Sequence, residues 1–435
     1  MNTSYVQINP SHPDYIRLMD PAGLIAYYNG LCDRIEQLEN DIHIFVPGTY
    51  DRQRLLAQAH TLLETYPHPD DRPPLFGLPL GVKDIFRCDG FRTGCGSLLP
   101  PVLFEGPEAT CVKRLKAAGA VVTGKTITTE FAYFEPGPTR NPWNVNHTPG
   151  GSSSGSAAGV AAGFFPWALG SQTIGSVIRP AAFCGIMGFK PSLGRIPTDG
   201  VIPFSQTVDH VGLFAGSMEG LDPMMIALDP DWQEDKHLPE KEDIVLAVPA
   251  GPYLEQADPA CRAFFDQTLE RLKAAGISVK EIPALDDIDA INTRHQKLIA
   301  IEFANVHAPW FEAYRHLYRP KTVAIIEKGR LLAEEDSESL RSSCLELRQR
   351  LADAMLSEDV AAWICPSATG EAPAGLAGTG SPLMNLPWTH AGMPVISLPA
   401  GNGPRGLPLG IQLASAFMQD SSLVRIAEAV LKSIS

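Results

Sequence analysis

The chain has 435 residues, of which 44% are hydrophobic and 19% charged, with 38 glycines and 38 prolines. This length allows the fold to bury about 75% of the surface of the unfolded chain, and the composition excludes a disordered or fibrous protein. The net charge of −14 lacks the broad positive field that non-specific nucleic-acid binding requires. We therefore expect a globular protein whose main partner is not a nucleic acid.

The cysteines and the N-terminus predict a cytoplasmic protein. Eight cysteines lie far apart and form no C-x-x-C pair, which is typical of reduced thiols rather than of disulfides or a zinc site. The N-terminus has no basic segment followed by an apolar one, so no signal peptide is predicted. The most apolar run, residues 157–169, is interrupted by glycine and proline and is too short to span a bilayer. We expect no membrane partner, and a homodimer is left open.

Hydrophobic periodicity predicts alternating helices and strands. Residues 1–65 are expected to form N-terminal helices, because apolar side chains recur at helical spacing. Further helices are predicted at 110–118, 157–169, 259–275 and 423–434. Strands are predicted at 79–85, 120–123, 243–248, 362–365, 394–398 and 409–413.

This alternation indicates an α/β protein with one large α/β/α domain, in which helices cover a central mixed sheet. Residues 66–285 are expected to form most of the core, and residues 359–435 its C-terminal part. Between them, residues 286–358 are mostly helical and charged in pattern, which predicts a cap or insertion.

Residues 119–126 match the phosphate-binding pattern G-x-x-x-x-G-K-[ST]. A phosphate loop requires a flexible glycine-rich turn between a strand and a helix. Here an apolar, strand-like run occupies the position of that turn. We therefore interpret the segment as the end of a helix followed by a core strand, not as a nucleotide site.

Two hydroxyl-rich loops flank the predicted buried helix. The first reads TPGGSSSGSA over residues 148–157, and the second reads GSQTIGSVIRP over residues 170–180. Small residues between them allow close backbone approach, and serines of the first loop can cap the helix. A flexible linker does not continue into such a helix, so we expect both loops to meet at one site.

These motifs resemble the amidase signature family over residues 78–215, and weaker similarity extends to residue 410. The resemblance implies that Ser176 is a nucleophile, that Ser152 is a second serine with a cis peptide bond, and that Lys83 is the base. Ser176 follows Ser152 by 24 positions, which is the spacing of these two serines in that family.

The chemistry of the residues supports this assignment. A serine is a weak nucleophile until a neighbour takes its proton, and no Ser-His-Asp order is apparent. Lys83 can act as a base only when neutral, so burial must lower its pKa. Ser152 would relay the proton between Ser176 and Lys83, and Ser153 is expected to orient Lys83. The alternative for Lys83, a surface lysine paired with Asp84, is disfavoured by the two serine loops.

The second loop is also implied to form an oxyanion hole from the backbone amides of Thr173, Ile174, Gly175 and Ser176. Two residues depart from the family pattern. Gln172 stands where most members have an aspartate, so we expect neutral hydrogen bonds in place of an ion pair, or no bond at all. Ile174 stands in place of a glycine, which either narrows the site or changes its backbone angle.

Arg179 lies three residues after Ser176, rather than the two that are usual in the family. It either binds a substrate carboxylate or carbonyl or anchors the loop. The resemblance places Phe131 and Tyr133 close to the acyl site, and Gln172 is a further candidate for substrate contact. The acyl pocket is expected to form from residues 125–135, the helical insertion and the C-terminal loops.

We therefore expect an amidase that hydrolyses carbon–nitrogen bonds other than peptide bonds, without a metal or other cofactor. Its substrate would be a small-molecule amide, including aryl amides and carbamates (urethanes). One alternative is the amidase subunit of an aminoacyl-tRNA amidotransferase, against which the acidic charge and the unusual Gln172 loop argue. Another is a non-catalytic binding protein on an amidase fold, against which the intact Lys-Ser-Ser set argues.

Overall fold

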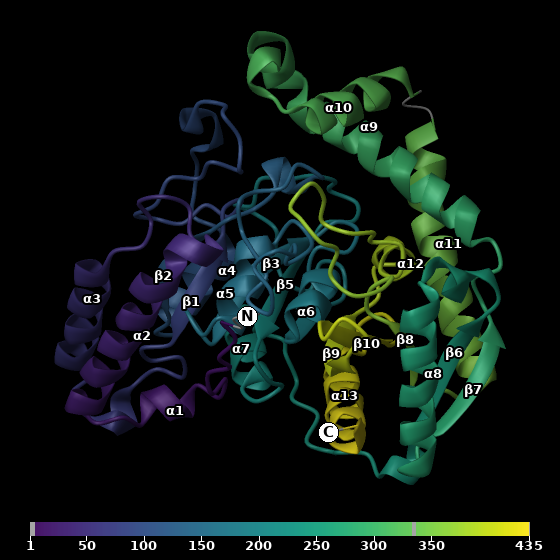
Figure 1. The fold of residues 1–435 in the computed structure, drawn as a ribbon, viewed down its shortest axis with the longest axis horizontal. Coiled ribbons are helices and arrows are strands. Elements are labelled where there is room, and N and C mark those ends of the chain that lie inside the picture. The colour runs from purple at the N-terminus through teal and green to yellow at the C-terminus, as the bar shows by residue number, and fades with distance from the viewer. Residues whose placement is uncertain (1–4, 333–335, 435) are drawn as a thin grey trace.

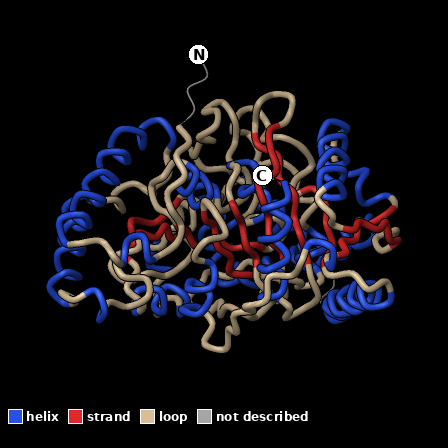
Figure 2. Tube along the Cα trace, turned by 90° about the horizontal axis from the view of Figure 1, so that it is seen from below, coloured by secondary structure: helices blue, strands red, loops and turns tan. Residues whose placement is uncertain are grey.

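The computed structural model describes residues 5–332 and 336–434, and within them a ten-stranded sheet runs through the molecule with helices packed around it (Figures 1 and 2). The strand order is β2-β1-β3-β5-β4-β9-β10-β8-β6-β7. The strands are β1 (Pro79–Lys83), β2 (Val121–Thr126), β3 (Trp167–Gln172), β4 (Met187–Lys190), β5 (His210–Ala215), β6 (Val245–Ala250), β7 (Ser278–Pro283), β8 (Ala362–Pro366), β9 (Val395–Asn402) and β10 (Pro408–Ala414). Parallel pairs lie toward both ends of the sheet and antiparallel pairs in its middle, so the predicted mixed α/β sheet is confirmed.

The α-helices in the described residues account for most of the rest of the chain. They are α1 (Asp14–Arg17), α2 (Pro21–Ile42), α3 (Arg52–Thr65), α4 (Thr110–Ala117), α5 (Ser154–Ala161), α6 (Ile178–Cys184), α7 (Leu221–Leu228), α8 (Pro259–Ala274), α9 (Ile288–Tyr314), α10 (Pro320–Leu331), α11 (Asp336–Ser357), α12 (Leu386–His390) and α13 (Asp420–Ile434). None of these described helices combines the length and hydrophobicity needed to cross a lipid bilayer.

The helix predicted over residues 157–169 is wrong in its second half. Helix α5 ends at Ala161, and residues 167–172 form β3 between β1 and β5. Gly163 takes a left-handed φ of +73°, a conformation that stops a helix, and Pro166 cannot continue one. The second hydroxyl-rich loop therefore follows a central strand, and its first residues belong to the sheet.

The segment that matched a phosphate-loop pattern is a core strand, as predicted. Gly119 has φ +100° just after α4, and β2 follows, buried along its whole length. Strand β2 pairs in parallel with β1, and Lys83 is the register partner of Thr126. The glycine is thus a turn between helix and strand, and the lysine of the pattern belongs to the sheet.

The helical character predicted for residues 286–358 is observed in α9, α10 and α11. Helices α9 and α10 lie against each other in the green arm at the upper right of Figure 1. Helix α9 also packs on α11 and α12. Because α12 lies next to the second serine loop, this packing brings side chains of the insertion to the candidate site.

Candidate active site

Lys83 is the last residue of β1 and is fully buried. Its Nζ lies 2.7 Å from Ser152 Oγ and 2.7 Å from Ser171 Oγ. Strands β1 and β3 are parallel neighbours, and the carboxyl ends of parallel strands meet at one edge of a sheet. Ser171, near the end of β3, is for this reason placed beside Lys83.

Burial lowers the pKa of Lys83 from 10.5 to about 7, although the charge of Asp209 acts in the opposite direction. Burial also raises the pKa of the Asp209 carboxyl to about 6. No ion pair links Lys83 to a carboxylate among residues 5–332 and 336–434. A large fraction of Lys83 is therefore neutral near neutral pH, and a neutral amine can accept a proton.

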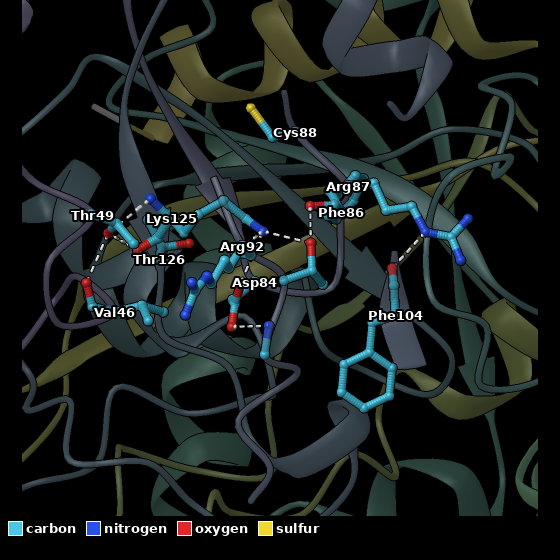
Figure 3. A network of polar contacts seen from close by, with 12 residues as sticks. Val46, Thr49, Asp84, Phe86, Arg87, Cys88, Arg92, Phe104, Lys125 and Thr126 are labelled. Atoms are coloured by element: carbon cyan, nitrogen blue, oxygen red, sulfur yellow. Dashed lines mark hydrogen bonds and ion pairs between the residues drawn. The ribbon is translucent and has the colours of Figure 1, made fainter. Parts of the chain in front are cut away.

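Asp84 pairs with another lysine. Lys125 Nζ lies 2.9 Å from Asp84 Oδ1, and both side chains are buried (Figure 3). The ammonium of Lys125 also lies 3.2 Å from Thr93 Oγ1, to which it donates. The alternative of a surface Lys83 paired with Asp84 is wrong, because Lys83 is buried and the carboxylate is occupied by Lys125.

Ser153 does not contact Lys83, which corrects the role predicted for it. Its hydroxyl donates to the Ser171 carbonyl at 3.2 Å and accepts from the Ser171 amide at 3.3 Å. Ser153 thus holds the backbone of β3, while the Ser171 hydroxyl contacts the lysine. If residues 167–172 are read as a strand parallel to β1, the sequence itself points to Ser171.

The peptide bonds of the described residues are all trans, so the cis linkage implied at Ser152 is absent from this structure. Two left-handed glycines, Gly150 with φ +80° and Gly151 with φ +60°, make the turn that leads to Ser152. Glycine reaches this region without a steric penalty. The glycine turn delivers the Ser152 hydroxyl to Lys83.

Ser176 precedes α6 and lines a pocket of about 10 Å³, called here the Ser176 pocket, together with Ser152, Thr173, Ile174 and Arg179. In the part of the chain that the structure describes, no hydrogen bond joins the hydroxyls of Ser176 and Ser152. Ser152 and Ser176 therefore line the same small space, and of these two serines only Ser152 contacts Lys83. This arrangement can pass a proton from Ser176 through Ser152 to Lys83 once a substrate brings the hydroxyls together.

The loop that carries Ser176 presents unpaired amides. The N–H groups of Thr173, Ile174, Gly175 and Ser176 have no acceptor among the described residues. Four consecutive free donors beside a serine can stabilise an oxyanion. This is the arrangement that the sequence predicts for these amides.

The carbonyls of the same loop are held by residues distant in sequence. His295 Nε2 lies 3.1 Å from the Thr173 carbonyl oxygen, and the Thr389 hydroxyl donates to the Ile174 carbonyl at 2.7 Å. In a trans peptide the N–H points away from the carbonyl of the same unit. These two bonds therefore turn the amides of Ile174 and Gly175 away from α9 and α12.

The tautomer of His295 follows from its partners. A carbonyl only accepts, so His295 Nε2 carries the hydrogen, and its Nδ1 lies 3.2 Å from His390 Nδ1. His390 Nε2 lies 2.9 Å from the Ser343 hydroxyl, which donates to the Leu340 carbonyl at 2.6 Å. Burial lowers the pKa of His295 well below its usual value and that of His390 to about 4. Both imidazoles are neutral near neutral pH and connect α11 and α12 to the loop.

Gln172 is fully buried and binds only the protein, in contrast to the predicted substrate contact. Its Oε1 accepts from the amides of Val177 at 2.8 Å and Ile178 at 3.0 Å. Its Nε2 donates to Thr389 Oγ1 at 2.9 Å. Neutral hydrogen bonds thus occupy the place where the family has a carboxylate, and they fix the start of α6.

Arg179 anchors the loop and also lines the Ser176 pocket. Its guanidinium donates to the Gly380 carbonyl and to the Thr379 hydroxyl, and its Nε has no partner. Burial lowers the pKa of Arg179 to about 9. None of the described carboxylates pairs with it. The predicted anchoring contact is present, and the cation stands on the pocket wall.

Tyr133 lines the Ser176 pocket, whereas Phe131 does not. Phe131 is buried against Phe104, His307 and Tyr318, with ring centroids 4.5 to 5.6 Å apart. The expectation that both aromatic residues lie near the acyl site holds only for Tyr133. Phe131 and Ala132 take left-handed φ values of +46° and +61°, so the segment is not extended and a spacing of two does not place the two side chains on one face.

Asp209 and His295 contribute to the site without a local signal in the sequence. The Thr173 hydroxyl donates to Asp209 at 2.5 Å, and Asp209 also accepts the amides of Phe204 and Ser205 at 2.7 and 3.0 Å. His295 lies 122 positions from Thr173. No pattern of neighbouring residues could have identified either one, because the sheet and the helical insertion bring them to the loop.

The fold and this arrangement define an α/β enzyme with a buried lysine and paired serines, and comparison with known proteins identifies the family. The Amidase family model matches residues 27–424, and the chain belongs to the amidase family. It is 32% identical to a glutamyl-tRNA(Gln) amidotransferase subunit of Synechococcus sp. (strain WH7803), over 91% of this chain and 90% of that protein. It is an enzyme acting on carbon–nitrogen bonds other than peptide bonds.

Solved structures share the whole fold. A crystal structure of an amidase superposes with a TM-score of 0.84 at 28% identity, covering 95% of this chain and 96% of that one. A structure concerning a vestigial protein complex and the origins of an s-triazine catabolic enzyme gives a TM-score of 0.81 at 30% identity, covering 94% of each chain. The corresponding glutamyl-tRNA(Gln) amidotransferase subunit from Thermotoga maritima shares the fold with a TM-score of 0.76 at 23% identity, covering 96% of this chain and 94% of that one.

Proposed function

We propose that this protein hydrolyses small-molecule amides through an acyl-enzyme on Ser176. Neutral Lys83 takes the proton of Ser152, and Ser152 takes the proton of Ser176. At the same time Ser176 Oγ attacks the carbonyl carbon of the substrate. The amides of Ile174 and Gly175 stabilise the oxyanion. Collapse of this tetrahedral intermediate breaks the C–N bond, and the proton returns through Ser152 to the leaving amine. Water then attacks the acyl group by the same route and releases the acid.

One observation carries this proposal: a fully buried lysine without a carboxylate partner lies 2.7 Å from a serine that shares a pocket with Ser176. Burying an unpaired cation is costly, and a structural role would be served better by an apolar residue. A functional role accounts for the retained lysine, because desolvation keeps the amine basic and neutral at working pH.

The direct test is the Ser176→Ala variant. We expect kcat/KM for any accepted amide to fall by about 10³-fold or more, and the acyl adduct seen by mass spectrometry of quenched wild type to be lost. Ser154→Ala is a matched control, because this serine lies in the first serine loop, two residues after Ser152, but donates to the Ile127 carbonyl at 3.3 Å instead of lining the Ser176 pocket. Full activity of Ser176→Ala would refute the assignment.

The substrate range is tested with anilides, primary amides, carbamates and half-amides of dicarboxylic acids, ranked by kcat/KM. Arg179 is the group in the pocket wall that could distinguish them by charge. If it binds a substrate carboxylate, Arg179→Ala will weaken the half-amides much more than the neutral amides. Equal losses for both groups would leave Arg179 with its anchoring role alone.

A second candidate is the amidase subunit of an amidotransferase, which the names of the curated relatives favour at 27–32% identity. Such a subunit acts with partner subunits and needs a route for ammonia. The purified chain alone distinguishes the two candidates. Hydrolysis of simple amides without a partner supports the first, whereas activity confined to glutamine and dependent on added subunits supports the second. A chain that binds amides without turnover would be the non-catalytic protein.

A further inference from the structure

A larger cavity opens beside the Ser176 pocket. This side chamber has a volume of about 330 Å³ and lies between α9, α10 and the loop that leads to α12. It shares Tyr133, Phe134, Ile174 and Pro382 with the wall of the Ser176 pocket. The two spaces therefore adjoin at Ile174, whose amide is one of the free donors of the loop.

The Ser176 pocket cannot hold a substrate by itself. Its volume of about 10 Å³ is close to the space needed for a single water. It has room for the reacting carbonyl and little else. The body of any substrate must extend into a neighbouring space, and the side chamber has the volume of small-molecule sites, which is typically about 300–1,000 Å³.

The chamber floor is apolar and its rim is polar. Ile299 and Ala300 of α9, Ile325 of α10 and Leu386 of α12 line it, and each is at most 5% exposed. Polar side chains occur at Gln296, Lys328 and Ser381, of which the first two are exposed. None of the floor residues offers a hydrogen bond from its side chain, so recognition there depends on the burial of apolar surface.

We propose that the side chamber is a subsite for an apolar arm of the amide substrate, either alkyl or aryl. This inference rests on the function proposed above and specifies its substrate class. A cavity of about 150 Å³ can hold benzene, so the chamber has room for an arm of about twice that size. The substrates are medium-sized hydrophobic amides rather than acetamide or glutamine.

The test uses two homologous series: straight-chain primary amides from acetamide to octanamide, and N-alkyl acetamides from methyl to hexyl. The arm lies on the acyl side of the scissile bond in the first and on the amine side in the second. We expect kcat/KM to rise about threefold to fourfold per methylene in one series, which is the typical gain for a buried CH₂. The rise should stop when the chamber is full.

Variants of α10 then connect this effect to the chamber. Ile325→Trp fills the space and should lower the ratio of long-arm to short-arm kcat/KM by at least tenfold. Ala324→Trp adds the same side chain at the adjacent exposed position of the same helix and should keep the wild-type ratio. If Ile325→Trp does not fold, Ile325→Ala enlarges the chamber and should shift the optimum to longer arms.

The outcomes separate this inference from the proposed function. Hydrolysis of short and long amides with equal kcat/KM, or a length dependence that Ile325→Trp and Ala324→Trp change equally, would overturn the chamber and leave the amidase function standing. Hydrolysis of no compound in either series would overturn the chamber, and if the anilides, carbamates and half-amides are not hydrolysed either, the proposed function is overturned as well. A rise with arm length that Ile325→Trp alone removes is the expected result.

Discussion

Two buried lysines on neighbouring strands show how surroundings decide the chemistry of a residue. Lys83 ends β1 among hydroxyls, while Lys125 on β2 lies 2.9 Å from Asp84. The carboxylate compensates the charge of Lys125, whereas hydroxyls compensate that of Lys83 only in part. The lysine without a counter-ion has the pKa of about 7 that a general base requires.

The pH dependence of the reaction follows from this pKa. Lys83 accepts a proton only in its neutral form, which predominates above the folded-state pKa. We therefore expect kcat/KM to increase about tenfold per pH unit below pH 7 and to level off above it. The measurement is a pH profile with a neutral amide that itself does not titrate. A flat profile from pH 5 to 9 would contradict a lysine base.

Ser171 offers a sharper check on the same lysine. Its hydroxyl accepts from Lys83 Nζ at 2.7 Å, and an acceptor stabilises the ammonium more than the amine. Ser171→Ala should therefore move the acidic limb of the pH profile to lower pH, and it should reduce kcat about tenfold through lost orientation. Ser171→Thr keeps a hydroxyl and should restore the position of the limb. A tenfold loss without a shift would assign Ser171 a purely structural role.

At the scale of elements, the second serine loop is shaped by helices that come from other parts of the chain. The carbonyls of Thr173 and Ile174 are bound by α9 and α12. Glu302 of α9 also accepts from the Ser205 hydroxyl at 2.6 Å and from the Thr207 amide at 3.1 Å. The helical insertion thus holds both the oxyanion loop and the segment before Asp209.

Removing these carbonyl contacts should affect the transition state more than substrate binding. His295→Leu and Thr389→Val each free one carbonyl, so the Ile174 or Gly175 amide is no longer held in position. We expect kcat to fall about tenfold to a hundredfold with little change in KM. His295→Gln and Thr389→Ser retain a donor and should recover most of the loss. An increase in KM alone would indicate that the helices shape the binding pocket instead.

At the scale of the whole molecule, Lys83 and Lys125 should have opposite effects on stability. Lys83→Met removes a buried cation without a counter-ion, and Lys125→Met leaves the Asp84 carboxylate buried and unpaired. We expect Lys125→Met to lower the free energy of unfolding by about 3–5 kcal/mol. Lys83→Met should raise it by about 2–4 kcal/mol at pH 7, since one unit of pKa corresponds to roughly 1.4 kcal/mol.

The gain from Lys83→Met should depend on pH. The folded-state pKa of Lys83, about 7, lies below the usual value of 10.5, so the unfolded chain binds one more proton between these values. Wild-type stability therefore rises with pH across this window, and the advantage of the variant shrinks toward pH 10. Denaturant unfolding of both proteins at pH 6, 8 and 10 measures the difference in their free energies of unfolding. An advantage that does not change with pH would show that packing rather than charge is responsible.

Much of the architecture was predictable because regular elements leave periodic traces. The strands near residues 79, 245, 362, 395 and 408 were located within two residues of their observed starts. The sequence pattern does not predict strands β4, β5 and β7, and the helix it predicts over residues 157–169 overlaps the start of β3. Its six residues read WALGSQ, and a short apolar run buried on both faces has no period that separates a strand from a helix.

The amino-acid sequence by itself determined the family, the two serine loops and the lysine, because these residues stand at fixed spacings along the chain. Only the tertiary structure decided that Ser171 rather than Ser153 meets Lys83, that Asp84 belongs to Lys125, and that Gln172 faces the protein. It also decided that α9 of the insertion and α12 of the C-terminal part aim the amides of the loop. The physical reason is that burial and hydrogen-bond partners depend on which strands are neighbours and which helices cover them, and residues more than a hundred positions apart settle both.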